Sequence, residues 1–298
     1  MDKIKDIIIY DNKSCSCYER SLATICCKED KHFEMMFLDA WDFNLEKKEP
    51  INKMGDVLYI EGWNLETSIE KYHGIKLNKF TVICFDKSFE ELLKQEISEN
   101  RFVIIDEEYV LYDIDFSNDY KLYSMRNNKF VSYSPEEFSK ICHEIICYSY
   151  EQNHVILSYD QIAEHTKQRL LSTNEKIDVF KKMDSFVEIF YYIFDPLKEF
   201  EMVEEYDKCR LIEFLIETSR GRKLFSLNID SELPNQKQLN ELLIMAEAKW
   251  SSIMALFVKI FYSKEMTNVV KNKIYKSIKE AIAIEKEAFL TLCNSINQ

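Results

Sequence analysis

Four of the nine cysteines of this chain lie within fourteen residues, in the stretch SCSCYERSLATICC that spans residues 14–27. Thiols this close together suit a metal site, a disulfide or a nucleophile. Their spacing, Cys-x-Cys followed by an adjacent pair, does not match the Cys-x2-4-Cys pairs of tetrahedral zinc sites. An odd number of cysteines with no recognisable export signal favours free thiols. We therefore expect reduced cysteines and no metal here.

The residues that follow Cys17 have helical spacing and predict a helix over residues 17–27. Cys26 and Cys27 fall on or beside its apolar face, so they are interpreted as small core side chains. Cys15 and Cys17 lie instead where the helix begins, and the positive end of a helix favours a thiolate there. Cys17, with Cys15 as the fallback, is therefore the candidate nucleophile.

The elements that must position this thiol differ along the chain. Up to residue 133, short apolar runs rich in Ile, Val, Tyr and Phe alternate with breaks, which is typical of strands. Strands are expected over residues 6–10, 56–60, 80–85, 102–105, 109–116, 120–125 and 129–133, and helices over 17–27, 65–73 and 88–98. An α+β domain is therefore predicted for residues 1–133.

From Ser134 onward the apolar spacing becomes helical. Ser134 and Pro135 open a capping box, and apolar residues recur at three- and four-residue intervals from Phe138 to Ile146. Further helices are expected over residues 159–171, 174–194, 198–218, 235–262 and 265–294. An all-α bundle is therefore predicted for residues 134–298.

Composition narrows the class of protein. With 39 Lys and Arg against 52 Asp and Glu, the net charge is −13, which repels a phosphate backbone and argues against nucleic acid as a partner. No run of about 18 uncharged apolar residues predicts a membrane span, and no basic start leads into an apolar leader. We expect a cytoplasmic globular protein that does not bind membranes.

Beyond composition, two motifs carry a resemblance to a known family. The run CYERSLAT (residues 17–24), followed by FLDAWDF (37–43), resembles the opening of the butirosin biosynthesis protein H family. In that family a Cys-x-Glu-x-x-Leu-Ala-Thr helix precedes a small-Trp-x-Phe segment. The strand ending at Asp106, Trp250 in a long helix and Glu285 in the last helix are similar too. The resemblance is spread over nearly the whole chain.

The resemblance implies a papain-like fold for residues 1–133 and an acyl transfer reaction in antibiotic, nonribosomal peptide or other specialised-metabolite biosynthesis. Cys17 would take the acyl group from an acyl carrier protein thioester and pass it to the amine of a small-molecule acceptor. Trp41, Asp106 and Tyr109 are the expected substrate-binding residues. No cofactor is expected, because phosphopantetheine would arrive only as part of the carrier protein.

One departure from the family pattern leaves the activity open. The family continues after the Asp106 strand with a His-Tyr strand, whereas this chain has no histidine between His73 and His143. Either that strand is deleted, or residues 108–112 occupy it and Glu108 replaces the histidine base. A carboxylate with an ordinary pKa of about 4.3 is a poor base for a thiol. The alternative is a catalytically degenerate relative that serves as a carrier-binding or accessory subunit.

A basic cluster suggests where a carrier protein would bind. Arg220, Arg222 and Lys223 flank a glycine in the helical region, and arginine pairs well with the phosphate of a prosthetic arm. Basic residues also favour helix C-termini for electrostatic reasons, so that interpretation stays open. A further hypothesis sets the resemblance aside and assigns the aromatic helices to a homodimer interface.

Overall fold

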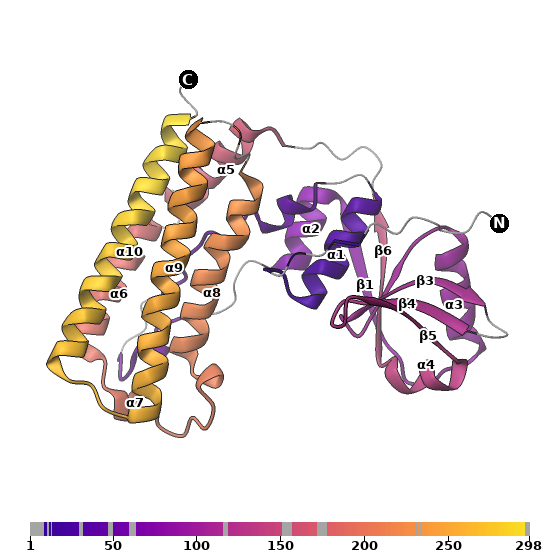
Figure 1. The fold of residues 1–298 in the computed structure, drawn as a ribbon, viewed down its shortest axis with the longest axis horizontal. Coiled ribbons are helices and arrows are strands. Elements are labelled where there is room, and N and C mark those ends of the chain that lie inside the picture. Colours follow the sequence, from indigo (N-terminus) through magenta and orange to yellow (C-terminus); the bar gives the residue numbers. More distant parts are fainter. Residues whose placement is uncertain are drawn as a thin grey trace. The chain divides into compact units, whose positions relative to one another are not determined.

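The computed structural model describes residues 9–10, 12, 14–29, 32–46, 50–59, 64–115, 119–150, 157–171, 178–229, 232 and 234–295. The chain forms two compact units, each made of two stretches of sequence (Figure 1). The first unit comprises Met1–Met36 and Leu65–Ile156, and the second comprises Phe37–Asn64 and Leu157–Gln298. This division differs from the predicted boundary at Ser134 in two places.

The first unit is built on a six-stranded sheet in which all neighbouring strands are antiparallel, in the order β1-β6-β2-β3-β4-β5. The strands are β1 Ile75–Thr81, β2 Val103–Ile105, β3 Tyr109–Asp115, β4 Asp119–Ser124, β5 Lys129–Tyr133 and β6 Glu144–Tyr150. β2 to β5 lie close to where the sequence predicts them. The strand expected over residues 80–85 is shifted toward the N-terminus, and most of the one expected over 6–10 lies outside the described residues.

Strand β6 corrects the prediction of one helix from Phe138 to Ile146. The helix α4, Pro135–Ile141, begins at the predicted capping box but stops before Cys142. Ile145 then pairs with both β1 and β2, which places β6 inside the sheet. A central strand is apolar on both faces, and so short a run matches helical spacing equally well. Because β6 pairs with β1 and β2, these residues form a strand, and the first unit extends beyond residue 134.

The two faces of this sheet are covered by different helices. On one face, Ile145 and Leu111 pack with Leu93 of α3, Lys87–Ser98, and with Phe138 of α4. Neighbouring residues of a strand point to opposite faces, so Tyr148 faces away from that core. Its hydroxyl donates to Glu29 at the end of α1, Cys17–Lys28, over 2.7 Å. The helix α1 therefore lies on the face opposite α3 and α4.

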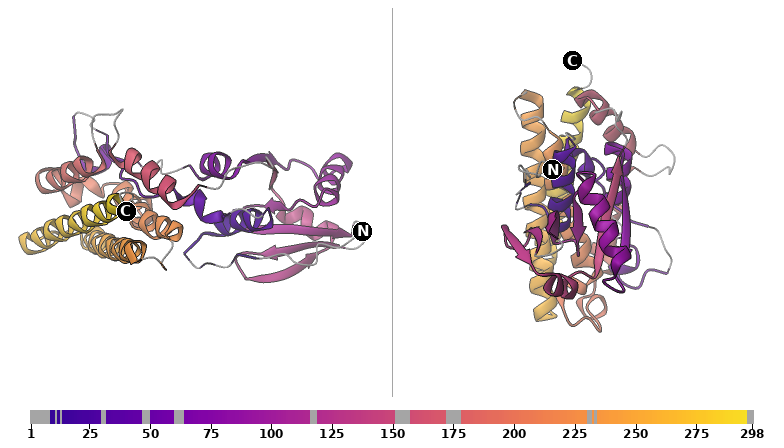
Figure 2. Two further views of the ribbon diagram at one scale, coloured as in Figure 1. Left: turned by 90° about the horizontal axis from the view of Figure 1, so that it is seen from above. Right: turned by 90° about the vertical axis from the view of Figure 1, so that its right-hand side faces the viewer.

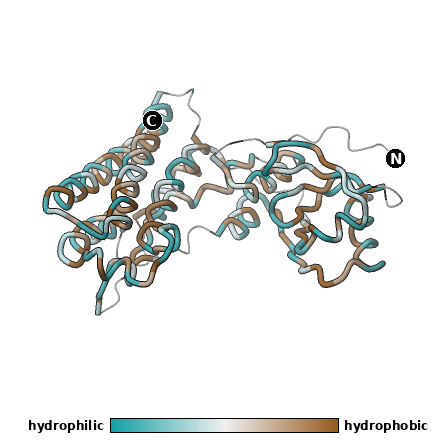
Figure 3. The backbone as a smooth tube through the Cα atoms, turned by 60° about the horizontal axis from the view of Figure 1, so that its bottom comes forward, coloured by the Kyte–Doolittle hydropathy of each residue, from teal (hydrophilic) through white to brown (hydrophobic). Residues whose placement is uncertain are grey.

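The second unit is helical. Its helices are α5 Tyr159–Leu171, α6 Val179–Ile193, α7 Pro196–Glu199, α8 Arg210–Phe225, α9 Pro234–Ser263 and α10 Asn268–Ser295. The long helices α9 and α10 run side by side (Figures 1 and 2). Figure 3 shows hydrophobic and hydrophilic residues alternating along the helices, as expected for amphipathic elements. The helix predicted over 198–218 is instead two helices, α7 and α8, separated by residues 200–209.

A segment predicted to belong to the α+β domain joins the helical unit instead. Phe43 is almost fully buried and packs edge-on against Phe214 of α8, with ring centroids 4.9 Å apart. Its ring also lies 5.6 Å from that of Trp250 on α9. Within the same segment, the strand expected over 56–60 contributes only an isolated bridge at Leu58. The aromatic residues of this segment complete the bundle core, which explains why the unit boundary does not follow the sequence texture.

Candidate active site

The first turn of α1 fixes the position of the Cys17 thiol. Ser16 caps the helix: the Glu19 N–H donates to Ser16 Oγ over 3.2 Å, and the Ser16 N–H donates to Glu19 Oε2 over 2.7 Å. Such a capping box holds the first turn in one conformation. Cys17 is the first helical residue and is half-buried. The predicted placement of this thiol at the start of a helix is confirmed.

A guanidinium group faces this thiol. Arg20 Nη2 lies 3.7 Å from Cys17 Sγ, and Arg20 itself is only 9% exposed. Its other contacts go to the turn between β4 and β5, where Nη1 donates to Asn128 Oδ1 over 2.7 Å and Nη2 donates to the Met125 carbonyl. Asn128 has a φ of 50°, a left-handed conformation that asparagine tolerates. The turn therefore holds the guanidinium against the sulfur.

Two positively charged features lie close to the sulfur. The helix N-terminus and the guanidinium both present positive charge to Cys17. Because the thiolate and not the thiol is the nucleophile, the site suits attack on an activated carbonyl such as a thioester.

Cys15 is placed less favourably for chemistry. It precedes the capping residue, and its N–H donates to the Asn12 carbonyl over 3.0 Å. The residue is 7% exposed, whereas Cys17 is half-buried. Access therefore favours Cys17 over the fallback nucleophile.

Glu108, the expected replacement for the histidine base, reaches the site only through its backbone. Its carbonyl accepts from the Met125 N–H over 2.8 Å, so it supports the same turn that holds Arg20. Its carboxylate points elsewhere and lies 3.6 Å from Arg126 Nη1. Among the described residues, the contacts of this carboxylate do not place it as a base for Cys17.

Asp106 bonds to a histidine, His143, that is not part of the family pattern. Its Oδ2 lies 2.9 Å from Nδ1 of His143, and its carboxylate also accepts from the N–H groups of His143 and Glu144. These bonds connect the end of β2 to the start of β6. The imidazole is largely exposed. Among the described residues, Cys17 Sγ bonds to Arg20 and to no imidazole, so the histidine–thiol pair of a papain-like enzyme is not formed.

Tyr109, expected to bind substrate, lies on the wrong face of the sheet. It packs against the core formed with α3 and α4, and its ring is 6.3 Å from that of Tyr133. Burial and the Tyr133 hydroxyl raise the pKa of its phenol to about 12. Because α1 covers the opposite face, Tyr109 does not line the Cys17 site.

Next to the thiol, Tyr18 anchors a charged network. Its hydroxyl donates to Glu66 Oε1 over 3.2 Å, and Lys79 Nζ lies 2.7 Å from the same oxygen. The Lys79 ammonium also lies 3.5 Å from Glu107 and 5.0 Å from the centre of the Tyr18 ring. Burial, reinforced by Glu66, raises the pKa of the Tyr18 phenol. The network fixes the residue after Cys17 against α2, Leu65–His73, and β1.

Trp41 and Arg222 belong to the other unit, where both are completely buried. Arg222 Nε and Nη2 donate to the two carboxylate oxygens of Glu285 over 2.8 and 2.9 Å. The indole N–H of Trp41 donates to Glu285 over 2.8 Å, and that of Trp250 donates to the same carboxylate. Each of these buried polar groups therefore has a hydrogen-bond partner within the helical unit. We expected Trp41 to contact substrate and Arg222 to contact a carrier protein. The structure corrects both predictions, because both side chains have structural roles in the core.

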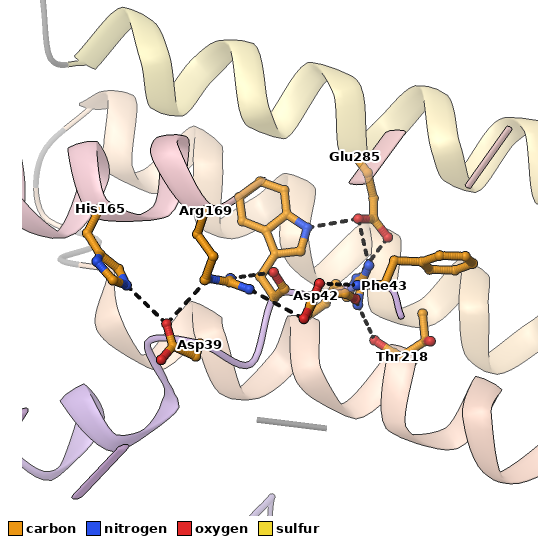
Figure 4. Close-up of polar contacts among 9 residues, drawn as sticks. Asp39, Asp42, Phe43, His165, Arg169, Thr218 and Glu285 are labelled. Carbon is orange, nitrogen blue, oxygen red and sulfur yellow. Dashed lines mark hydrogen bonds and ion pairs between the residues drawn. The ribbon is translucent and has the colours of Figure 1, made fainter. Parts of the chain in front are cut away.

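The segment that carries Trp41 is also held from the side of α5 (Figure 4). His165 Nε2 lies 3.0 Å from Asp39 Oδ1, and Arg169 Nε lies 3.3 Å from the same oxygen. Arg169 further donates to the Trp41 carbonyl over 2.5 Å and lies 3.7 Å from Asp42. These bonds clamp the Trp41 segment onto the helices.

The remaining members of the predicted basic cluster do not act together. Arg220 is partly exposed and pairs with Glu217 one turn earlier, at 3.6 Å, while Lys223 is exposed. With Arg222 turned into the core, the three side chains do not form one basic surface. A carrier protein contact at Arg220 and Lys223 stays a prediction.

Sequence reasoning missed the two residues that define the site, Arg20 and Asn128. A signal for Arg20 was present, because a residue three positions after Cys17 shares its helix face. Asn128 had no such signal, since a β-turn more than a hundred positions away meets α1 only in the folded chain.

No family model matches the chain, and no curated protein matches it. The described parts of the chain contain no group of three or more His, Cys, Asp or Glu residues arranged to hold a metal ion. No helix in the described ranges has the length and apolar character needed to cross a membrane.

Proposed function

We propose that this protein is a cysteine-dependent acyltransferase that takes an acyl group from a carrier protein thioester and delivers it to the amine of a small molecule. The observation that carries the proposal is the Arg20 guanidinium held 3.7 Å from Cys17 Sγ at the start of a capped helix. The resemblance of residues 17–24 to the butirosin biosynthesis protein H family supports the same reaction and a papain-like relationship for the first unit.

The chemistry needs no group beyond the two substrates. The Cys17 thiolate attacks the thioester carbonyl, its bond to the acyl carbon forms, and the bond to the carrier sulfur breaks. The carrier leaves as a thiolate that takes a proton from solvent. The acceptor amine then attacks the Cys17 thioester, loses a proton to solvent, and releases Cys17 as a thiolate. Thiol–thioester exchange starts from a thiolate, and here the thiol proton passes to solvent; the guanidinium cannot accept that proton, but it can stabilise the negative charge left on the sulfur.

The test is formation of the acyl-enzyme. The protein is incubated with S-acetyl-N-acetylcysteamine, which mimics the end of the phosphopantetheine arm, and with acyl-loaded carrier proteins, and its intact mass is measured. The proposal predicts one added acyl group, absent from Cys17→Ser and retained in Cys15→Ser. An unmodified wild-type protein, or equal labelling of Cys17→Ser, would contradict it.

A second function is favoured by a specific observation: Arg20 also ties α1 to the β4–β5 turn, and no described imidazole bonds to Cys17. These contacts fit a degenerate relative that binds a carrier protein or pathway enzyme without catalysis. In cells that make the product, Cys17→Ser would then leave production unchanged while deletion of the protein would abolish it. Loss of product with Cys17→Ser alone excludes this alternative.

A further inference from the structure

Exposed hydrophobic side chains gather at one end of the helical unit. The short helix α7 lies at this end, where α9 gives way to α10 (Figure 1). Met202, just after α7, is 97% exposed, and Tyr262 in the last turn of α9 is 70% exposed. Ring contacts join the two segments: Tyr206 lies 6.2 Å from Tyr262, and Phe200 lies 5.2 Å from Phe261, between ring centroids. We call the exposed set the apolar end; its members are Tyr192, Leu197, Met202, Tyr262 and Val269.

Carboxylates accompany the apolar end and form an acidic group. Four of them follow α7 in the sequence and the fifth follows α9: Glu201, Glu204, Glu205, Asp207 and Glu265. All five are exposed, and among the described residues none has an ion pair or a side-chain hydrogen bond. Like charges that lie close together repel unless opposite charges reach them. The acidic group therefore favours a partner that brings positive charge to this end.

The first turns of α10 supply positive charge at the same end of the unit. Lys273 and Lys276 are exposed and follow Val269 by four and seven residues, so the three side chains share one side of the helix. Lys273 has no ion pair within the described ranges. Lys276 has only a 3.9 Å contact with Glu280 one turn later. The apolar end thus carries lysines on α10 and carboxylates on the segments after α7 and α9.

From this arrangement we infer that the apolar end binds a second copy of this chain, in a two-fold symmetric dimer in which the acidic group of each copy faces Lys273 and Lys276 of the other. A two-fold axis brings the same surface together from both copies, so a surface with both charges beside an apolar centre is complementary to itself. The apolar side chains lose contact with water in the dimer. The opposite charges fix the register and offset the repulsion between two chains of net charge −13. The inference is independent of the proposed function.

The test is an exchange of charges followed by sedimentation equilibrium. We expect the wild-type protein to dimerise at about 100 µM in about 50 mM salt, and to dissociate as salt rises to about 500 mM. Lys273→Glu with Lys276→Glu should weaken dimerisation at least about tenfold. Glu204→Lys with Glu205→Lys should weaken it as well, although this change lowers the net charge and with it the general repulsion. The protein with all four changes has its charges exchanged and its net charge restored, so it should dimerise again.

Two matched controls change the same kinds of charge elsewhere in the helical unit. Lys237→Glu lies near the start of α9 and Glu287→Lys near the end of α10, both exposed and away from the apolar end. Each should leave the dimerisation constant within about twofold of wild type. A wild-type protein that stays monomeric overturns the inference and leaves this surface to a different partner. A dimer that survives both double changes, or that the four combined changes fail to restore, overturns it too.

Discussion

Cys17 differs from three other described cysteines in what surrounds its thiol. Burial raises the pKa of the Cys142 and Cys147 thiols to about 12, so both stay protonated and unreactive at neutral pH. Cys84 is exposed, but its thiol bonds to Asp86 over 3.3 Å, and that carboxylate raises its pKa. At Cys17, the guanidinium of Arg20 lies 3.7 Å from the sulfur. Cys17 should therefore be the most reactive of these four cysteines.

Replacing the guanidinium tests this ranking. Arg20→Gln keeps a polar side chain but removes the positive charge beside Cys17, so the thiolate loses its nearest stabilising partner. We expect the rate of iodoacetamide labelling at Cys17 to fall about tenfold, while labelling of Cys84 in the same sample stays constant. Peptide mapping by mass spectrometry measures both rates at once. Equal labelling rates at Cys17 in the two proteins would show that Arg20 plays no part in its reactivity.

At the scale of elements, the site arises where the first turn of α1 meets the β4–β5 turn. The helix supplies the thiol and the guanidinium, and the turn supplies the two oxygens that fix the guanidinium. Neither element forms the site alone. The helix could be predicted from its capping signal and periodicity. Its partner turn could not, because local sequence does not record which distant loop packs on a helix end.

A substitution in the turn isolates this positioning role. Asn128→Gly allows the same left-handed backbone, at φ 50°, but removes the Oδ1 that anchors Arg20. We expect labelling of Cys17 to slow by about threefold or more, because the guanidinium is no longer held against the sulfur. The adjacent Asn127, which bonds to Ser124 instead, provides the control. An equal effect of Asn127→Ala and Asn128→Gly on Cys17 labelling would contradict the positioning role.

At the scale of the whole molecule, the sequence predicts much of the secondary structure but misassigns its grouping. Helices α1, α2, α5, α9 and α10 and strands β2 to β5 follow local periodicity, because each has an apolar pattern of its own. The predictions that were wrong concern residues whose structure depends on contacts with distant parts of the chain. The residues of β6 have helical spacing in the sequence but form a strand of the sheet. The segment around Trp41 lies in the part of the sequence predicted to be α+β, but it fills the core of the helical unit. The candidate nucleophile was predicted, while its partner was not.

The buried pair in the helical unit predicts a large effect on stability. Glu285→Ala leaves the Arg222 guanidinium and two indole N–H groups without their shared acceptor inside the core. Breaking a buried pair from one side costs about 3–5 kcal/mol. Urea unfolding followed by tryptophan fluorescence measures this loss. Glu287→Ala, an exposed change on the same helix, should stay within about 0.5 kcal/mol of wild type; similar losses for both would refute a structural role for the buried carboxylate.

If Cys17 is an activated acyl acceptor, it is acylated faster than an ordinary thiol. The protein and N-acetylcysteine are mixed with the same concentration of S-acetyl-N-acetylcysteamine at neutral pH, and the acylated fraction of the tryptic peptide spanning residues 14–20 is followed by mass spectrometry. We expect Cys17 to be acylated at least about a hundredfold faster than the free thiol, on the scale of an oxyanion site. Acylation no faster than that of N-acetylcysteine would contradict it.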